Sequence, residues 1–218
     1  MTLEDLWPLF GLTLTTPRLI LRPVRDEDLP ELAQAALDGI HDPAVMPFGR
    51  PWTDAPPSEM PRRLAEYQWQ LRSGVRPDHW NVAFGVHFDG RVVGVQDLGA
   101  RDFANRQTVN TGSWLTQRVQ GIGLGTEMRA ALLMFAFDVL DARWAESGAA
   151  SWNAPSLAVS EKLGYERNGV SRVISRAGHP EDELRVRLER AAFIRPDWAL
   201  DVQGAAPVLR QLGLTAPS

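Results

Sequence analysis

The feature that most constrains this chain is a glycine-rich segment, residues 120–127, with the sequence QGIGLGTE. Its glycines alternate with other residues, and an apolar-periodic stretch follows directly. Glycine lacks a Cβ, so the backbone can turn sharply there and bring its N–H groups against a ligand. A helix that begins at this point adds unpaired N–H donors and the positive end of its macrodipole. The segment therefore predicts a cradle for an anion, most simply a pyrophosphate.

Three glycine-loop patterns compete for this segment. A Walker loop needs Gly-Lys-Ser/Thr after a four-residue spacer, and no such tripeptide follows. A dinucleotide fingerprint needs glycine where this chain has Thr126, and it belongs in the first strand–helix unit rather than past the midpoint. The remaining pattern is Q/R-x-x-G-x-G/A, which Gln120, Gly123 and Gly125 satisfy. A glycine-rich turn before an ordinary helix stays open as the alternative.

With this pattern the chain resembles the GNAT superfamily of N-acetyltransferases, whose corresponding loop binds the pyrophosphate of coenzyme A. Residues 153–165, NAPSLAVSEKLGY, are similar to a later motif of the superfamily, Asn-x-x-Ser-x-x-hydrophobic-x-Glu-Lys-Leu-Gly-Phe/Tyr. The simpler interpretation is that Asn153 caps a helix and Ser156 completes its first turn. Two signatures in the right order favour the superfamily.

Further resemblances are narrower. Residues 16–23 (TPRLILRP) and 112–115 (GSWL) resemble the ribosomal-protein N-terminal acetyltransferase branch of the superfamily. The block from His41 to Trp52, together with the opening WPLF, resembles an actinobacterial subgroup linked to succinyl-CoA.

Composition limits the other functions. The 218 residues suit one domain, residues 1–195, with an N-terminal arm 1–12 and a C-terminal extension 196–218. A net charge of −4 gives no global basic field for nucleic acid. The chain has no cysteine, which excludes disulfides, thiolate metal sites and a cysteine acyl-enzyme. We expect a cytoplasmic protein without a signal peptide, a membrane span or a metal.

Periodicity and turn chemistry predict the elements in order. The arm carries apolar anchors at Leu6, Trp7, Leu9 and Phe10. The expected strands are 13–24, 80–88, 91–98, 111–115, 143–151, 165–175 and 183–188. The expected helices are 26–37, 58–73 with Ser58 as cap, 124–140 and 155–163, and the tail after Pro196 suggests one strand and a short helix. This order predicts an α/β fold: a mixed, mostly antiparallel twisted sheet flanked by helices on both faces, as the resemblance also implies.

The resemblance implies direct acyl transfer from acetyl-CoA or succinyl-CoA to a primary amine, with catalysis mainly by positioning. A backbone N–H near residues 114–116 would polarise the thioester carbonyl. The residues expected to hold the cofactor are Trp114, Leu115, Thr116, Gln120, Gly121, Ile122, Gly123, Leu124, Gly125, Thr126, Asn153 and Ser156.

The acid–base residues are less defined. Many superfamily members place a tyrosine seven residues after the asparagine, where this chain has Ser160, so Ser156 is the preferred replacement. The candidates for the general base are His41, Asp97, Asp102 and Glu127. His41, Trp52 and Asp97 are expected to contact the acceptor, and the cations available for a succinyl carboxylate are Arg50, Arg72 and Arg76.

Two other functions stay open: a non-catalytic acyl-CoA sensor with the same fold, and a nucleotide-binding regulatory domain, whose fingerprint residues are missing. Protein N-termini, lysines, aminoglycosides and polyamines are all compatible acceptors. The aromatic loops and the C-terminal extension are compatible with a homodimer.

Overall fold

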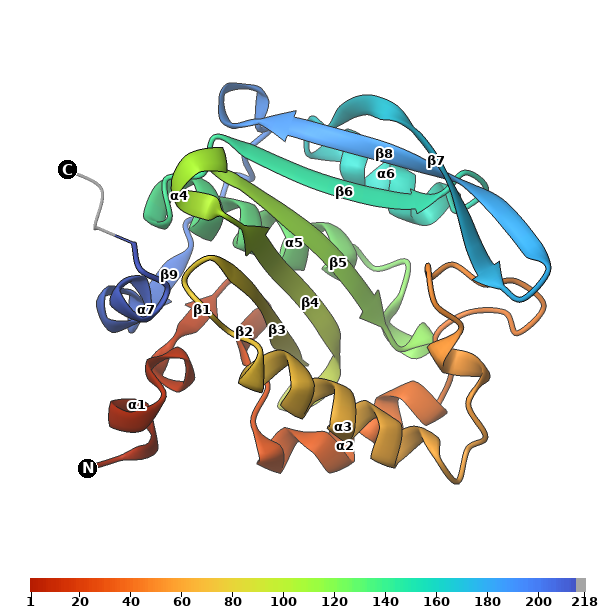
Figure 1. The fold of residues 1–218 in the computed structure, drawn as a ribbon, viewed down its shortest axis with the longest axis horizontal. Helices are drawn as coiled ribbons and strands as arrows, with labels where there is room; N and C mark the ends of the chain where they lie inside the picture. The colour runs from red at the N-terminus through yellow and green to blue at the C-terminus, as the bar shows by residue number, and fades with distance from the viewer. Residues whose placement is uncertain (215–218) are drawn as a thin grey trace.

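The computed structural model describes residues 1–214, and its centre is one mixed β-sheet (Figure 1). The order of strands is β7-β8-β6-β5-β4-β3-β2-β1-β9, and neighbours are antiparallel except for β5 and β6. The strands are β1 Thr13–Thr15, β2 Leu19–Pro23, β3 His79–Phe88, β4 Arg91–Arg101, β5 Thr108–Leu115, β6 Trp144–Ala150, β7 Glu166–Arg176, β8 His179–Glu189 and β9 Asp201–Gln203. The predicted fold class is confirmed.

Helices cover both faces of this sheet (Figure 1). The α-helices are α1 Leu3–Leu6, α2 Leu29–Leu37, α3 Met60–Ser73, α4 Phe103–Arg106, α5 Leu124–Met134, α6 Ala154–Lys162 and α7 Ala205–Gln211. Short helical turns are η1 Pro8–Gly11, η2 Asp26–Asp28, η3 Trp52–Asp54, η4 Gln117–Val119, η5 Phe135–Val139 and η6 Arg190–Ala192. The pair α2–α3 covers one face of the sheet, whereas α5 and α6 cover the other.

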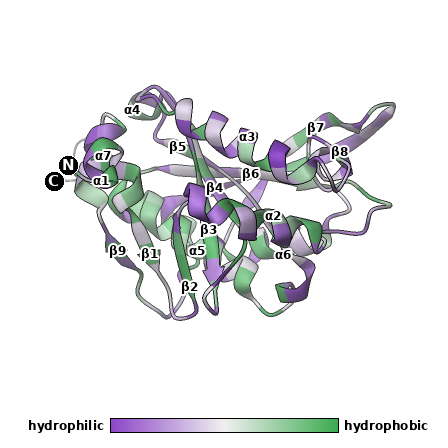
Figure 2. Ribbon diagram, turned by 90° about the horizontal axis from the view of Figure 1, so that it is seen from below, coloured by the Kyte–Doolittle hydropathy of each residue, from purple (hydrophilic) through white to green (hydrophobic). Residues whose placement is uncertain are grey.

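Each face has its own apolar cluster. On the α2–α3 face, Leu32 and Leu64 pack against Val95 of β4. On the α5 face, the larger cluster includes Leu98 of β4 and Leu132 of α5. Successive residues of β4 therefore alternate between the two clusters, as a strand with both faces covered requires. Along α3, hydrophilic and hydrophobic segments alternate in Figure 2, in keeping with one face on the sheet and one in solvent.

Local chemistry explains the β3–β4 hairpin. Asp89 and Gly90 both have positive φ, 50° and 74°, as a two-residue type I′ turn requires. This tight turn holds β3 and β4 in long antiparallel register, from Phe88–Arg91 at the turn to His79–Arg101 at the far end. The hairpin is thereby the central ribbon of the sheet.

Several predicted boundaries needed correction. The strand expected over 13–24 is two antiparallel strands, β1 and β2. Helix α3 starts at Met60 with Glu59 rather than Ser58 at its cap, and the helix expected to Leu140 leaves α-geometry at Phe135 for one π-turn. Leu6, expected as an apolar anchor of the N-terminal arm, is exposed, and α1 buries none of its residues.

The relation between β5 and β6 positions the functional site. These parallel neighbours pair only from Thr108–Trp144 to Asn110–Glu146. Beyond that point β5 continues against β4 as far as Leu115, and β6 continues against β8 as far as Ala150. The two strands therefore diverge, and their facing edges open toward the start of α5.

Candidate active site

A cavity of about 660 Å³ lies at this opening. Its walls come from the end of β5, the glycine-rich segment, the start of α6, the β6–β8 edge and the loop over residues 40–49. The predicted site residues that line it are His41, Trp114, Leu115, Gln120, Gly121, Gly123, Gly125, Thr126, Asn153 and Ser156. Two sequence signatures more than 25 residues apart thus meet at one opening.

The glycine segment has the conformation that its composition predicts. Gly121 and Gly123 have φ values of 77° and 89°, a region that L-residues with a side chain rarely adopt. Gly123 is the N-cap of α5, and no side chain caps this helix. The first N–H groups of α5 consequently have no intrahelical acceptor, and they face the cavity with the positive end of the helix dipole.

The side chain of Gln120, which was expected to help hold the pyrophosphate, forms hydrogen bonds within the protein. Its amide nitrogen donates to the carbonyls of Leu115, at 2.7 Å, and Ile40, at 2.8 Å. The side chain thus ties the glycine segment to the end of β5 and to the loop after α2. Gln120 borders the cavity while its amide donors are used inside the protein.

A buried carboxylate fixes the opposite side of the segment. Glu127 accepts hydrogen bonds from the hydroxyl of Thr16 at 2.6 Å, and from the backbone N–H and Nε of Arg18 at 3.0 and 2.6 Å. The same guanidinium donates to the carbonyl of Ile122 at 3.0 Å. Glu127 is therefore a structural anchor, and the hypothesis that it is the general base is wrong, because its oxygens are engaged away from the cavity.

Three residues expected to hold the cofactor do not line the cavity. The side chains of Thr116 and Leu124 are fully buried, the latter in the core under α5. Ile122 points outward and is 52% exposed. These three side chains face away from the cavity because alternate residues of a turn or a strand face opposite ways, and contact of their backbone with the cofactor stays a prediction.

The backbone donors near the opening can be assigned by the same alternation. The N–H of Thr116 donates to the carbonyl of Val93 at 2.8 Å, so it faces β4 and not the opening. The carbonyl of Thr111, in contrast, accepts from Ser147 of β6. Alternation along β5 therefore directs the N–H groups of Ser113 and Leu115 toward the opening.

The second signature combines both interpretations open for it. The side-chain oxygen of Asn153 accepts from the backbone N–H of Ser156 at 3.3 Å, which caps α6. Both side chains still line the cavity. Ser160 does not: it is buried, it accepts from Arg129 at 2.9 Å, and its own hydroxyl donates to the carbonyl of Ser156. Ser160, a candidate catalytic residue by its place in the motif, therefore does not reach the cavity, because its position on α6 directs its side chain toward α5.

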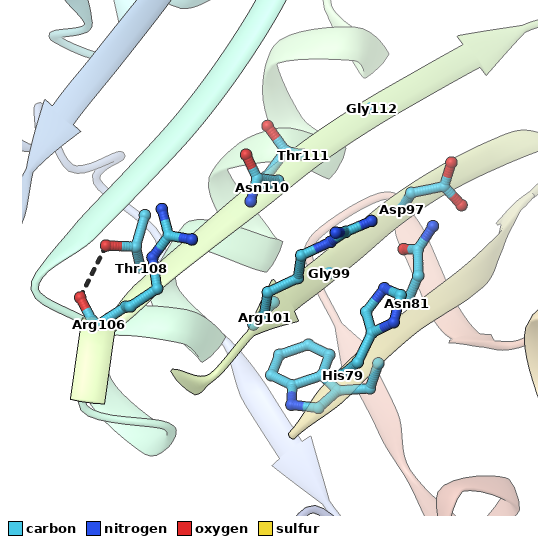
Figure 3. Close-up of a pocket in the computed structure, with 12 residues that line it drawn as sticks. His79, Asn81, Asp97, Gly99, Arg101, Arg106, Thr108, Asn110, Thr111 and Gly112 are labelled. Carbon is cyan, nitrogen blue, oxygen red and sulfur yellow. Dashed lines mark hydrogen bonds between the residues drawn. The ribbon is translucent and has the colours of Figure 1, made fainter. Parts of the chain in front are cut away.

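Asp97 lies on the other face of the sheet. On β4 it shares a face with Val95, which packs under α2 and α3, and the charge of Asp97 influences Tyr67 of α3. A second cavity, of about 450 Å³, opens beside Asp97, and Figure 3 shows the carboxylate next to Asn81 of β3. Gly112 of β5 lines both cavities. A Cβ on Gly112 would lie 3.7 Å from Oδ2 of Asp97, so the carboxylate of Asp97 lies beside this glycine.

Asp97 is also the carboxyl group with the clearest shift in acidity. Its Oδ1 is enclosed and has no hydrogen-bond partner, although the side chain as a whole is partly exposed. Burial without a compensating cation raises the pKa of Asp97 from 3.8 to about 7. A group with this pKa can accept a proton from an amine near neutral pH.

The other two candidate bases are occupied. His41 lines the cavity, but its ring nitrogens are bonded to Thr53 at 2.7 Å and to the carbonyl of Asp42 at 2.9 Å. Asp102 lines neither cavity; it adopts φ 48° and accepts from Asn105 beside α4.

Trp52 packs rather than lines the cavity. Its ring lies between Phe48, at 5.4 Å, and Trp114, at 5.6 Å, measured between centroids. Phe48 in turn contacts the ring of His41 at 5.5 Å. This row of rings fastens the proline-rich loop to the end of β5, so the influence of Trp52 on a substrate is indirect.

None of the three arginines considered for a succinyl carboxylate lines the larger cavity. Arg72 is paired with Asp26 at 2.9 Å and lies over Phe10. Arg76 donates to the carbonyls of Ser73 and Val75.

Within residues 1–214, no three His, Asp or Glu side chains gather closely enough to coordinate a metal ion. Every helix in this same range is too short or too polar to cross a lipid bilayer.

A family model described as an acetyltransferase (GNAT) domain matches residues 18–166. The chain therefore belongs to the GNAT acetyltransferase family. Its fold is similar to that of Mycobacterium smegmatis RimJ in complex with CoA-disulfide, with a TM-score of 0.68 and 20% identity over 94% of this chain and 95% of that chain.

Two further solved structures share the fold. RimL, a ribosomal-protein α-N-acetyltransferase in complex with coenzyme A, has a TM-score of 0.64 and 19% identity over 81% of this chain and 97% of its own. A chimera of the spermidine N-acetyltransferase from Vibrio cholerae has a TM-score of 0.61 and 16% identity over 80% and 96%. The names of these proteins include both a protein and a polyamine acceptor, so the fold by itself leaves the acceptor open.

Proposed function

We propose that this chain is an N-acetyltransferase that transfers the acetyl group of acetyl-CoA directly to a primary amine. One observation carries the proposal: the uncapped start of α5 and the divergence of β5 from β6 open into a single cavity. The first can bind a pyrophosphate through N–H groups and the helix dipole. The second offers unpaired strand edges to the amides of a pantetheine arm.

The proposed reaction divides the work between the two faces of the sheet. N–H groups at positions 121–126 would hold the pyrophosphate, and Asn153 and Ser156 would bond to the pantetheine arm. The N–H of Ser113 or Leu115 would stabilise the oxyanion that forms on the thioester carbonyl. The amine would arrive from the cavity beside Asp97, and this carboxylate would take its proton.

The acidity of Asp97 also favours one class of acceptor. A protein α-amino group has an ordinary pKa of about 7.7–8.0, whereas that of a lysine is about 10.4. Proton transfer to a base whose pKa is about 7 is nearly balanced for the former and strongly uphill for the latter. We therefore propose a protein or peptide N-terminus as the acceptor.

Acetyl-CoA is proposed as the donor in preference to succinyl-CoA. The matching family model describes an acetyltransferase domain, which supports acetyl-CoA. Arg50, Arg72 and Arg76, the cations considered for a succinyl carboxylate, do not line the cavity, although Arg129 and Lys162 do. Membership of the succinyl-CoA-linked subgroup stays a prediction.

Isothermal titration with CoA, acetyl-CoA and succinyl-CoA tests the donor site. Thiol release then tests turnover, with one peptide that has a free N-terminus and blocked lysines, and a second with the reverse protection. Because the chain has no cysteine, every thiol detected comes from CoA. The proposal expects acetyl-CoA binding and thiol release with the first peptide. Binding to none of the three compounds would refute it, and binding without release for any amine would favour the sensor function.

A further inference from the structure

A buried cation lies beneath the larger cavity, at a position that the sequence motifs do not mark. Arg129, in the second turn of α5, is only 4% exposed and lines the cavity together with Ser113 and Ser156. Its Nη1 donates to Ser160 at 2.9 Å and its Nη2 to Ser113 at 3.4 Å, while Nε has no partner. Within residues 1–214, no carboxylate lies in ion-pair range of this guanidinium.

This arrangement leaves a positive charge without an anion. Burial lowers the pKa of Arg129, yet an arginine in a protein stays protonated. A buried charge that lacks a counter-ion weakens folding, and two neutral hydroxyls offset this cost only in part. Ser160 supplies no further charge, because its own proton is directed to the carbonyl of Ser156. The site is therefore suited to an anion that arrives with, or forms on, a ligand.

The location of Arg129 indicates which anion of the ligand it would meet. Gly125, at the predicted pyrophosphate cradle, precedes it by one helical turn, so Arg129 lies about 6 Å deeper along α5. It points toward Ser113, beside the N–H groups proposed to hold the thioester oxygen. The pantetheine arm between these points is uncharged. Two negative charges form near this depth during the reaction, one on the thioester oxygen and one on the departing sulfur. The strand N–H groups are proposed to hold the first, so the second is the one left for Arg129.

We infer that Arg129 donates a hydrogen bond to the CoA sulfur as it leaves and stabilises it as a thiolate. This inference rests on the proposed function. In the step concerned, the amine nitrogen bonds to the thioester carbonyl carbon, the C–S bond breaks, and its electron pair stays on sulfur. Asp97 on the opposite face takes the proton of the ammonium form before the attack and passes it to water, and the second proton, which the nitrogen loses as the amide forms, also passes to water. The thiolate is released as CoA and takes its proton from water.

Titration of the thiol of bound CoA tests the inference without an acceptor. The thiolate absorbs in the ultraviolet and the thiol does not, and the chain itself contributes no thiol. A cation within hydrogen-bond range lowers the pKa of an acidic partner by about 1–3 units. We expect such a shift for CoA bound to the unaltered protein, its loss in Arg129→Met, and its partial retention in Arg129→Lys. The exposed Arg210→Met is the matched control, with the shift unchanged.

The outcomes separate the two proposals. If the unaltered protein does not bind CoA, the proposed function fails. If it binds CoA and the thiol keeps the pKa of free CoA, the inference about Arg129 is overturned while the proposed function stands. A lowered pKa that persists in Arg129→Met overturns it as well, as does a variant that loses thermal stability and CoA affinity without any change in the thiol titration. The thiol titration of CoA bound to the unaltered protein still tests the inference if the Arg129→Met variant does not fold.

Discussion

Arg176 at the tip of the β7–β8 hairpin forms a two-pronged ion pair with Asp54, with Nε and Nη2 each 2.7 Å from a carboxylate oxygen. The same Nη2 donates to the carbonyl of Pro43 at 2.9 Å. The hairpin and the proline-rich loop, which approach each other in Figure 1, are thereby joined, and both contribute residues to the larger cavity, Glu183 from β8 and Phe48 from the loop. Bidentate geometry makes this pair more directional than an ordinary surface pair.

We predict that Arg176→Met separates these two walls with little loss of global stability, because both side chains are partly exposed. The Michaelis constants should rise several-fold, and proteolysis of the loop over residues 41–54 should become faster. Arg172→Met is the matched control, since Arg172 pairs with Asp182 within the same hairpin and bridges nothing else. Equal effects of the two substitutions would contradict the bridging role.

Asp97 allows a prediction about the pH dependence of activity. Its carboxyl group must be ionised to accept the amine proton, so kcat/KM should rise as pH increases through about 7. Asp97→Asn should lower kcat/KM by about 100-fold or more and remove this inflection, leaving only the titration of the amine. Steady-state rates with one peptide between about pH 5.5 and 9 test this. An unchanged profile in the variant would exclude Asp97 as the base.

The ionisation of Asp97 that should raise activity as pH increases should lower the stability of the fold. The folded protein holds the proton of Asp97 up to about pH 7, whereas the unfolded chain releases it near 3.8. Between these values the folded state binds more protons, so the contribution of Asp97 to the free energy of unfolding falls as pH rises. Urea unfolding at about pH 5 and about pH 7 should show this decrease in the unaltered protein and a smaller one in Asp97→Asn. A larger decrease in the variant would show that the sign is wrong.

Gly123 tests the anion cradle. Alanine at φ 89° is strained by about 1–2 kcal/mol, and the new Cβ would lie 3.4 Å from Nη2 of Arg18. Gly123→Ala should therefore weaken CoA binding by about tenfold, measured by titration calorimetry. Gly90→Ala carries a similar strain at φ 74° in an open turn far from the cavity, and it should change stability alone. If both variants bind CoA equally well, the cradle does not depend on this backbone conformation.

Glu127 offers a test of anchoring against catalysis. Glu127→Gln loses the charge that accepts from Arg18 and should cost about 1.5–3 kcal/mol of stability. CoA affinity should fall, because the guanidinium that also holds Ile122 is released. The pH profile of kcat/KM should keep its inflection, unlike that of Asp97→Asn. Glu166→Gln, exposed on β7, serves as the control for loss of a surface charge.

The parts of the fold that could be predicted are those that depend on local chemistry. Asp89 and Gly90 are enough to predict the turn between β3 and β4. Gly121 and Gly123 predict the turn before α5, because residues without a Cβ can adopt positive φ. The tail was also predicted correctly as a strand and a short helix. Element boundaries were less accurate where a cap is set by backbone contacts, as at Glu59.

The missed features depend on contacts between distant parts of the chain. Thr16 meets Glu127 across 111 residues, and this contact turns a candidate base into an anchor. In the sequence, nothing distinguishes Arg129 from the other polar residues of the predicted helix. That its guanidinium lacks a counter-ion becomes visible only when α5 is packed on α6 and β5. Asp97 was a candidate, but its position beside Gly112, the glycine that lines both cavities, depends on how β4 pairs with β5.

Strand β9 has a consequence for how the chain can be handled. Its three residues pair with β1, from Thr13–Gln203 to Thr15–Asp201, and so occupy a sheet edge that β1 would otherwise expose. An uncovered edge is a template for pairing with another polypeptide. Cutting the chain before Asp201 would uncover β1 and would also remove Val208 and Leu209 from the core cluster that contains Leu132 of α5, so a shortened version should be less stable and should aggregate more readily.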